Sequence, residues 1–326
     1  MLHFWTRNAP RMGLSHPFVL HFALALAAFH LAYLAKREIR SDDKDGSPRR
    51  SPSDYLAIAQ KHFTAGVSGF SSQLSEPTPD NCGVLYLGAV MTSYCTFADG
   101  PTSCDDLLVC AGFEGSAGRR EAYACPQMPF VSGVRLMNQS FSPNVLFSGL
   151  MKPLLQGPPL LENPIYVRDG FPRLDWEDAL DGLREFVASA GDSRGLEGHT
   201  EKVSLKALDD LIGIYAAVYG RRGGDGEIMC HGPPQNQFVF GWLYRVEPEF
   251  AGCVRRGDPR ALLVLAHFAV LLNEKTIQRG WYVEGWKQHI IARVGELLGS
   301  DRYSEWMRWP IDQAVLEEER APEERA

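Results

Sequence analysis

The most reactive side chains in this sequence belong to seven cysteines and nine histidines, and their spacing decides what chemistry they could perform. No two cysteines are separated by two residues, so the paired ligands of a structural zinc site are missing from the sequence. An odd number of thiols in a long chain does not indicate a disulfide framework. Cys230 and His231 adjoin, but neighbouring side chains usually point apart rather than form a nucleophile and its base. We therefore predict reduced, mostly buried thiols, no metal, no cofactor and no catalytic residue.

Asp209 and Asp210 form a pair of carboxylates within a predicted helix, where they could bind magnesium. Terpene cyclases are all-helical chains of similar size, and they hold magnesium with an aspartate-rich motif and a second Asn/Ser/Glu motif on a facing helix. Here the sequence continues Leu211-Ile212-Gly213, so the third carboxylate is missing, and we find no second motif. We expect both aspartates to face solvent. A helical enzyme of terpenoid or other secondary metabolism remains the alternative function.

Composition is that of an ordinary globular protein. The 326 residues are 45% hydrophobic and 22% charged, and the formal net charge is -7. An acidic chain with only short basic stretches is not expected to bind nucleic acid by itself.

Residues 15–35 contain no Asp, Glu, Lys or Arg, and a helix of this length could just cross a membrane. Its three histidines and its many alanines favour a buried core helix over roughly residues 17–36. A signal peptide would need a small-residue cleavage site, and none is convincing here. A membrane anchor is the alternative for this segment.

Apolar residues recur with helical spacing along most of the chain, whereas the alternation typical of strands is scarce. We predict an all-α fold, with a single helical bundle-like regulatory domain over residues 1–316 and a charged tail over 317–326. A mobile loop is expected at about 37–54. Residues 114–172 are expected to be irregular apart from one helix near 143–155.

Capping residues predict where several helices begin. Ser53 or Asp54 can cap one helix, Asn81 can cap the next, and Ser103 with Asp106 resembles a capping box before another. Further helices are expected from Asp175 to Gly191, from Thr200 to Gly220, and near 235–246, 248–256, 259–273 and 281–298. The intervening segment 221–234 has the composition of a loop.

The helix near 259–273 has the clearest pattern. Gly257 ends the helix before it, Asp258 can cap it, and Pro259 suits its first turn. From Ala261 to Leu272 the only residue that can carry a charge is His267. A helix that is apolar on every side is enclosed by other helices, so we predict that this is the central and most buried helix.

Three stretches of the chain resemble one known family. The first is residues 22–35 (FALALAAFHLAYLA), the second is 55–63 (YLAIAQKHF), and the third combines 240–250 (FGWLYRVEPEF), 258–273 (DPRALLVLAHFAVLLN), 281–286 (WYVEGW) and 306–310 (WMRWP). In this order they resemble the regulatory domain of fungal Zn(2)-Cys(6) zinc-cluster transcription factors, in the branch that includes the sterol uptake control regulators. The matches run from about residue 16 to residue 310.

This resemblance implies a regulator of transcription in the nucleus, with cytoplasmic retention as an alternative. It implies an apolar ligand, such as a sterol or a secondary metabolite, and protein partners in the transcription machinery or a zinc-cluster factor. Members of the family carry a six-cysteine zinc cluster before the regulatory domain, and this sequence contains none. Either the cluster is missing from this sequence or the protein is a stand-alone regulatory domain. We expect a protein that is not an enzyme, and this chain alone is expected to bind neither specific DNA nor a membrane.

Aromatic residues crowd the C-terminal third, which predicts an apolar ligand pocket between the helices near 235–246 and 259–273 and the helix from Trp281. His267 could form a hydrogen bond with a single ligand hydroxyl. The predicted lining residues are Phe238, Phe240, Trp242, His267, Leu271, Trp281 and Trp286. The alternative is a packed core without a cavity, which would favour a protein-interaction module.

Overall fold

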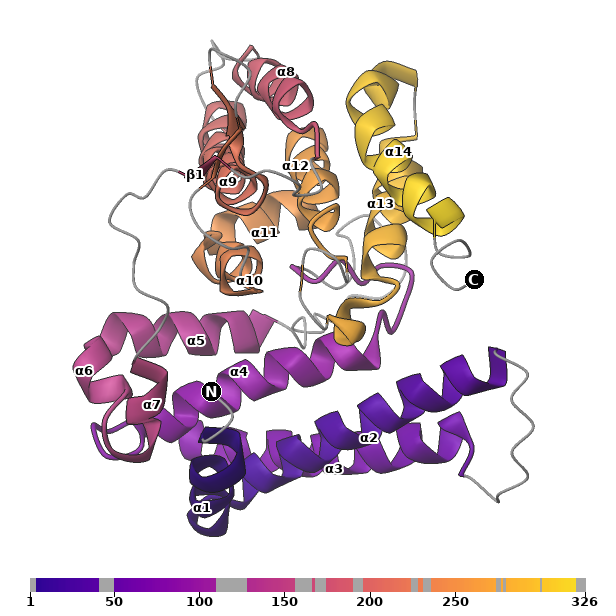
Figure 1. Ribbon diagram of the computed structural model, residues 1–326. Coiled ribbons are helices and arrows are strands. Elements are labelled where there is room, and N and C mark those ends of the chain that lie inside the picture. Colours follow the sequence, from indigo (N-terminus) through magenta and orange to yellow (C-terminus); the bar gives the residue numbers. More distant parts are fainter. Residues whose placement is uncertain are drawn as a thin grey trace. The chain divides into compact units, whose positions relative to one another are not determined.

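The computed structural model describes residues 4–40, 50–109, 128–155, 166–167, 174–189, 196–223, 228–230, 236–273, 277, 280–299 and 301–320 (Figure 1). Fourteen α-helices and three short strands account for most of these residues, so the predicted all-α fold is confirmed. The chain forms two compact units, whereas the sequence indicates one domain over 1–316. Unit 1 comprises Met1–Gly100 and Gln127–Leu160, and unit 2 comprises Pro101–Pro126 and Leu161–Ala326.

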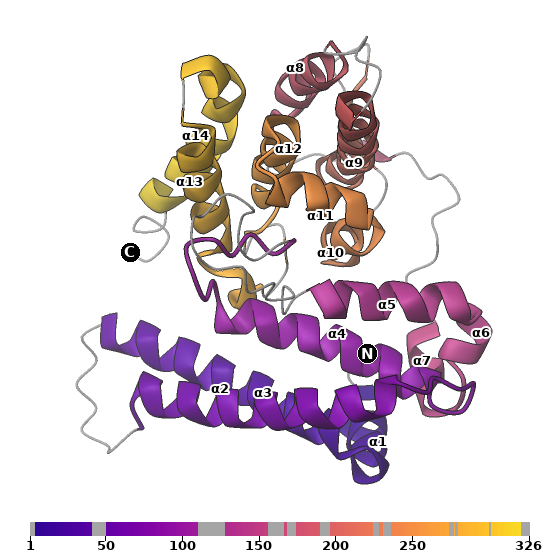
Figure 2. The same cartoon turned by 180° about the vertical axis from the view of Figure 1, so that it is seen from behind.

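Unit 1 is built around three long helices. Helices α2 (Pro17–Arg40) and α3 (Pro52–Leu74) lie side by side, and α4 (Cys82–Asp99) packs against both (Figures 1 and 2). A capping box starts α3, because the side chain of Ser51 accepts from the Asp54 amide while the Asp54 carboxylate accepts from the Ser51 amide. The shorter elements are η1 (Phe4–Asn8), α1 (Ala9–Ser15), α5 (Met128–Ser140), α6 (Pro143–Leu146), η2 (Gly149–Met151) and α7 (Lys152–Leu155).

Helix α5 corrects the prediction of an irregular region over 114–172. Its Val134 and Met137 are buried, and the helix packs against α4. A Cβ atom at Gly133 would lie 3.3 Å from the Cβ of Ala89, so the small residue permits a close approach of the two helices. Within 114–172 the structure describes residues 128–155 and 166–167. Residues 41–49 of the predicted loop lie outside the described residues.

The segment after α4 also differs from its prediction. Ser103 and Asp106 do not start a helix, and residues 101–109 form an irregular segment in which Leu107 and Leu108 are buried. The Asp106 carboxylate accepts hydrogen bonds from the amides of Thr102 and Leu108. The Asp106 side chain, which the sequence places in a capping box, instead stabilises a tight loop through these hydrogen bonds.

Unit 2 contains the other helices: α8 (Glu177–Ala188), α9 (Leu196–Tyr219), α10 (Asn236–Arg245), α11 (Pro248–Arg255), α12 (Pro259–Ala269), η3 (Trp281–Val283), α13 (Trp286–Leu298), η4 (Asp301–Tyr303) and α14 (Ser304–Arg320). The charged tail is therefore helical as far as Arg320, and residues 321–326 lie outside the described residues. The stripe expected on α8 is confirmed, because Trp176, Leu180, Leu183 and Val187 are all fully buried.

A small antiparallel sheet corrects the loop predicted at 221–234. Its strands are β1 (Tyr166–Val167), β2 (Arg221–Arg222) and β3 (Ile228–Cys230), in the order β1-β3-β2. Tyr166 pairs with Cys230, and Arg221 pairs with Met229. The strands are two or three residues long, so they leave the all-α character of the fold unchanged.

Helix α2 is less enclosed than the sequence predicts. Within Pro17–Arg37 it is long and apolar enough to cross a membrane, and 39% of the window that meets this test is buried. Phe18, Phe22 and Phe29 are buried, whereas Leu24 and Leu31 are exposed. The prediction of a core helix therefore holds for one face of α2 only.

Candidate functional site

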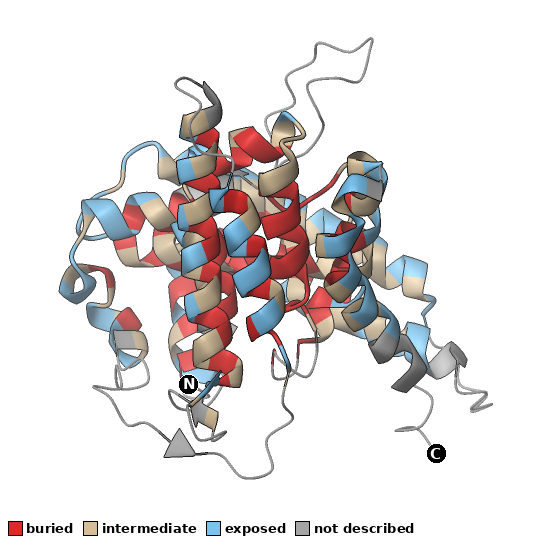
Figure 3. Ribbon diagram, turned by 90° about the horizontal axis from the view of Figure 1, so that it is seen from above, coloured by how far each residue is buried: buried red, intermediate tan, exposed pale blue. Residues whose placement is uncertain are grey.

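Helix α12 is the centre of the candidate site in unit 2. Gly257 adopts a left-handed conformation (φ +72°) that ends the preceding helix, and the Asp258 side chain accepts from the amides of Arg260 and Ala261. Every residue from Ala261 to Leu272 is buried, and α8, α9, α11, α13 and α14 contact the helix. Figure 3 colours the buried residues of the chain red and the exposed ones pale blue. The prediction that this helix is buried among other helices is confirmed. The neighbouring helices supply the residues that contact its side chains.

One side of α12 meets α10 and α11 through three aromatic rings. Phe268 stacks on Trp242 with ring centroids 4.3 Å apart and planes 18° apart. Phe250 meets Trp242 edge-on at 5.6 Å. The indole of Trp242 donates to the carbonyl of Ala207 on α9 at 2.8 Å, so its single polar atom already has a partner. This group provides a well-packed apolar wall.

A second side of α12 meets α9 and α14 at His267. The imidazole stacks on Trp309, with centroids 5.5 Å apart and planes 15° apart. Its Nδ1 lies 2.8 Å from the carbonyl oxygen of Leu263, which can only accept, so Nδ1 carries the proton of the neutral ring. The hydroxyl of Tyr215 donates to the backbone carbonyl of His267 at 2.6 Å. Nε2 is therefore left as the acceptor of the ring.

Burial keeps the His267 ring neutral. Removal from water lowers its pKa from 6.5 to about 4, and the hydrogen bond to Leu263 opposes this shift only in part. A neutral imidazole has one acceptor nitrogen, which suits a hydroxyl group rather than an anion. The indole of Trp309 donates to the carbonyl of Asp175 at 2.9 Å, so it fixes the ring that covers His267.

The remaining predicted lining residues belong to other contacts. The ring centroids of Phe240 and Tyr282 lie 6.0 Å apart, and those of Tyr282 and Trp281 lie 5.8 Å apart. Trp286 is fully buried and meets His289 edge-on, and Leu271 is fully buried in the turn after α12. Phe238 lies in α10, but its side chain is outside the described part of the chain. The predicted residues thus fall into several aromatic groups, and their common pocket stays a prediction.

Tyr215 and Trp309 are the contacts of His267 that were not among the predicted lining residues. Tyr215 lies on the predicted buried face of α9, and Trp309 lies beside Pro310 in α14. Their positions are 52 and 42 residues from His267 in the sequence, and helical spacing within one element cannot show such long-range pairs. Only the packing of α9 and α14 on α12 brings them to the histidine.

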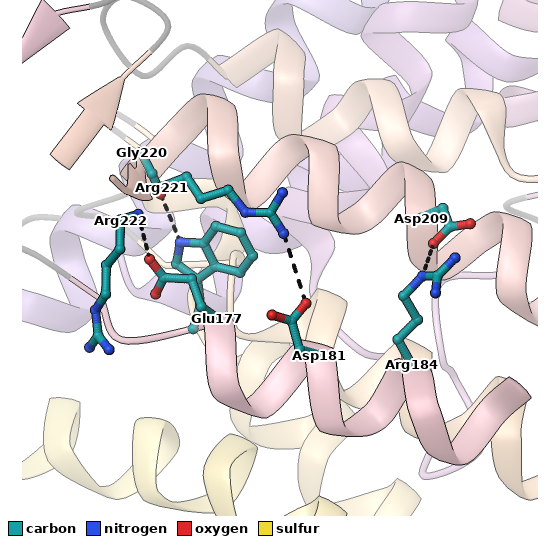
Figure 4. A network of polar contacts seen from close by, with 8 residues as sticks. Glu177, Asp181, Arg184, Asp209, Gly220, Arg221 and Arg222 are labelled. Carbon is teal, nitrogen blue, oxygen red and sulfur yellow. Dashed lines mark hydrogen bonds and ion pairs between the residues drawn. The ribbon is translucent and has the colours of Figure 1, made fainter. Parts of the chain in front are cut away.

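A polar network covers the outer side of α8 and α9 (Figure 4). Arg184 and Asp209 form an ion pair of 2.7 Å, and Asp181 lies 3.8 Å from Arg221. Beside them, the Glu177 carboxylate accepts from the Arg222 amide at 3.1 Å. Glu177, Asp181 and Arg184 follow helical spacing, so this charged face was visible in the sequence although its partners were not.

Asp209 is therefore occupied by Arg184 rather than arranged with other acids. Among the described residues, no group of three or more His, Cys, Asp or Glu side chains could hold a metal ion. Cys230 lies in β3, and His231 lies outside the described residues. Of the thiols that are described, Cys82, Cys95 and Cys253 are buried and free, and Cys104 is exposed and free.

Comparison with known proteins gives no relative for this arrangement. No family model, no curated protein and no solved structure matches the chain. The function must therefore be argued from the residues of α12 and from the sequence patterns around them.

Proposed function

We propose that the protein is a transcription-regulatory protein of the fungal zinc-cluster factor type, and that unit 2 senses an apolar metabolite or contacts partner proteins. The observation that carries this proposal is α12. It occupies the strongest stretch of the resemblance (258–273), and helices enclose it on all sides. On this proposal the protein acts in the nucleus, with the transcription machinery or a zinc-cluster factor as its partners.

The ligand on this proposal is an apolar molecule with one hydroxyl group, such as a sterol or a secondary metabolite. Trp242 and Phe268 are apolar rings on one side of α12, and Nε2 of His267, on a second side, could accept from the hydroxyl. A net hydrogen bond contributes only about 0.5–1.5 kcal/mol, so apolar burial must supply most of the affinity. Binding should therefore show a negative heat-capacity change.

A tethering experiment tests the regulatory function. The full chain is fused to an unrelated DNA-binding domain in a fungal host, and a reporter gene is measured with and without added sterols. We expect reporter output to differ from that of the DNA-binding domain alone, in either direction. Output equal to that control under every condition would contradict the proposal.

A binding experiment tests the ligand separately. Sterols should change tryptophan fluorescence and raise the melting temperature of the purified chain, because a ligand that binds only the folded state stabilises it. His267→Phe keeps a ring against Trp309 but removes the acceptor, so it should weaken binding about 2- to 10-fold. The matched control is His199→Phe, on the exposed side of α9. No response to sterols or other apolar metabolites would favour a protein-interaction module.

The alternative is a helical enzyme of terpenoid or other secondary metabolism. The ion pair between Arg184 and Asp209 weakens it, because the carboxylate that suggested a magnesium site already has a cationic partner. Magnesium-dependent turnover of prenyl diphosphates that Asp209→Ala abolishes would establish the enzyme instead.

A further inference from the structure

Helix α2 carries two apolar faces on opposite sides. The inner face packs against α3 and α4 and consists of Phe18, Phe22, Ala25, Phe29 and Ala32, all buried. The outer face consists of Leu20, Leu24, Ala27, Leu31 and Leu34. Both sets follow the same alternation of four- and three-residue steps, and the two-residue offset between them places them about 200° apart on the helix.

The outer face is open to solvent along the helix. Its leucines expose 36% (Leu20), 51% (Leu24), 44% (Leu31) and 41% (Leu34) of their surface. Leu20 lies over Gly13 of α1, and Leu14, the next residue of α1, is 80% exposed. A contiguous row of exposed leucines indicates an interaction surface, whereas single exposed leucines are ordinary.

Charge at the two ends of this face indicates what covers it. Residues 1–40 contain a single acid, Glu38, although the whole chain has a net charge of -7. Arg7 and Arg11 precede α2, Lys36 and Arg37 lie near its end, and all four are exposed. Trp5 is exposed beside them. Basic residues at both ends of an apolar helix face, together with an exposed tryptophan, suit an anionic lipid surface.

A second copy of the chain fits the same face poorly. If two outer faces met in antiparallel orientation, Arg7 and Arg11 would approach Lys36 and Arg37 of the other copy. A parallel arrangement would place each basic end against its equal. Either arrangement brings like charges together, and residues 1–40 offer only Glu38 to compensate them.

The inner face indicates how the helix meets the lipid. Phe18 and Phe22 contact Phe70 of α3 with ring centroids 5.7 and 6.3 Å apart, and Phe22 also contacts Phe63 at 6.2 Å. A helix that crossed the bilayer would have to give up these contacts or take α3 with it. Lying in the membrane plane keeps them and buries only the outer face.

We propose that the outer face of α2 binds the surface of an anionic phospholipid membrane, with the helix lying in the membrane plane and its basic ends near the headgroups. This surface belongs to unit 1, and the inference does not depend on the function proposed above. It replaces the expectation from the sequence that the chain binds no membrane.

Vesicle co-sedimentation of the full chain tests this inference. We expect the protein to sediment with vesicles of phosphatidylcholine mixed with phosphatidylserine, and less with phosphatidylcholine alone. High salt should weaken binding, because it screens the basic ends. Alkaline carbonate should release the protein from the vesicles, as expected for a helix that does not span them. Failure to sediment with the anionic vesicles at low salt, or retention after carbonate, would overturn the proposal.

A pair of charge substitutions identifies the face. Leu24→Glu together with Leu31→Glu should reduce binding at least about tenfold, because each carboxylate would have to enter the apolar layer. The matched control is Ile311→Glu together with Val315→Glu on α14, where the two side chains are 44% and 47% exposed. It adds the same charge and should retain binding. Equal losses in both variants would overturn the assignment to α2.

Two further measurements separate other occupants of the face. Light scattering should show that the outer face of α2 does not form a dimer. A dimer that Leu24→Glu with Leu31→Glu abolishes would make this face an interface between copies and would overturn the proposal. Circular dichroism should show that Leu24→Glu with Leu31→Glu melts within a few degrees of the unaltered protein. A large loss of melting temperature would mean that the protein itself covers the face, and it would also overturn the proposal.

Discussion

Helices α12 and α2 are both strongly apolar, yet their surroundings differ. In α12 and the turn after it, every side chain from Ala261 to Leu272 is buried among other helices of unit 2. In α2 only the face that carries Phe22 is covered, while Leu24 on the opposite side is half exposed. Apolar composition therefore does not decide how a helix is used. A helix closed on all sides stabilises the fold, whereas one open on a single side offers a surface.

The largest difference should appear when one leucine is truncated in each helix. Leu265→Ala removes a fully buried side chain from α12 and should lower the free energy of unfolding by about 2–5 kcal/mol, through lost burial and the cavity left behind. Leu24→Ala removes a side chain that is already half in water, so its cost should stay within about 0.5 kcal/mol. Urea unfolding followed by circular dichroism measures both. Similar costs at the two positions would contradict the comparison.

The second prediction concerns the pH dependence of stability in unit 2. Burial lowers the pKa of His267 to about 4, so the unfolded state takes up its proton at higher pH than the folded state does. The stability that the neutral ring provides is present above about pH 6.5 and is lost as the pH falls toward 4. The full loss is about 3 kcal/mol. His267→Asn should flatten this decline relative to the unaltered chain, as measured by urea unfolding at a series of pH values.

Tryptophan fluorescence makes that measurement specific for unit 2, because six of the seven tryptophans lie beyond residue 160. In unit 1, burial and the neighbouring His21 also lower the pKa of His62. The lowered pKa of His62 also makes the protein less stable as the pH falls. This effect in unit 1 should be followed by circular dichroism rather than by tryptophan fluorescence. An unchanged slope after His267→Asn would show that the ring is less buried than the structure indicates.

Residue patterns in the sequence were sufficient to place α12 and its cap. The start of α12 is indicated by three adjacent residues, Gly257, Asp258 and Pro259. The uncharged residues that follow indicate a buried helix without any knowledge of the helices that pack against it. The same kind of signal failed at Ser103 and Asp106, because the Asp106 carboxylate finds partners in its own loop. Helix α5 was missed because the small residues that suggested irregular structure serve a close contact with α4.

The candidate site was predictable only in part, for a related reason. Burial of Trp242 and His267 followed from their place in apolar helices. Their partners, Phe268 for Trp242 and Trp309 for His267, depend on how separate helices pack. The sequence determines this packing, but local residue patterns do not reveal it. The single pocket predicted from those patterns therefore contrasts with contacts that divide the residues among several aromatic groups.

The third prediction compares helix caps in the two units. The Asp258 side chain accepts from two amides at the start of α12 and is partly buried, so Asp258→Ala should cost about 1–2 kcal/mol. Ser51 caps α3 at an exposed position, and Ser51→Ala should cost about 0.5–1 kcal/mol. Urea unfolding followed by circular dichroism checks the order of the two. A larger cost for Ser51 would show that the start of α3 is the more important of the two for stability.

The smallest effect is expected on the surface of unit 2, at the ion pair of Arg184 and Asp209. Both side chains are 48% exposed, so water and salt screen their attraction, and holding two flexible side chains together costs entropy. Arg184→Ala, Asp209→Ala and the double variant should all unfold at nearly the urea concentration of the unaltered chain. Any coupling between the two sites should disappear at high salt. A strong coupling that persists in salt would show that water does not reach the pair, and this face of α8 and α9 would then be covered like α12 rather than open like the outer face of α2.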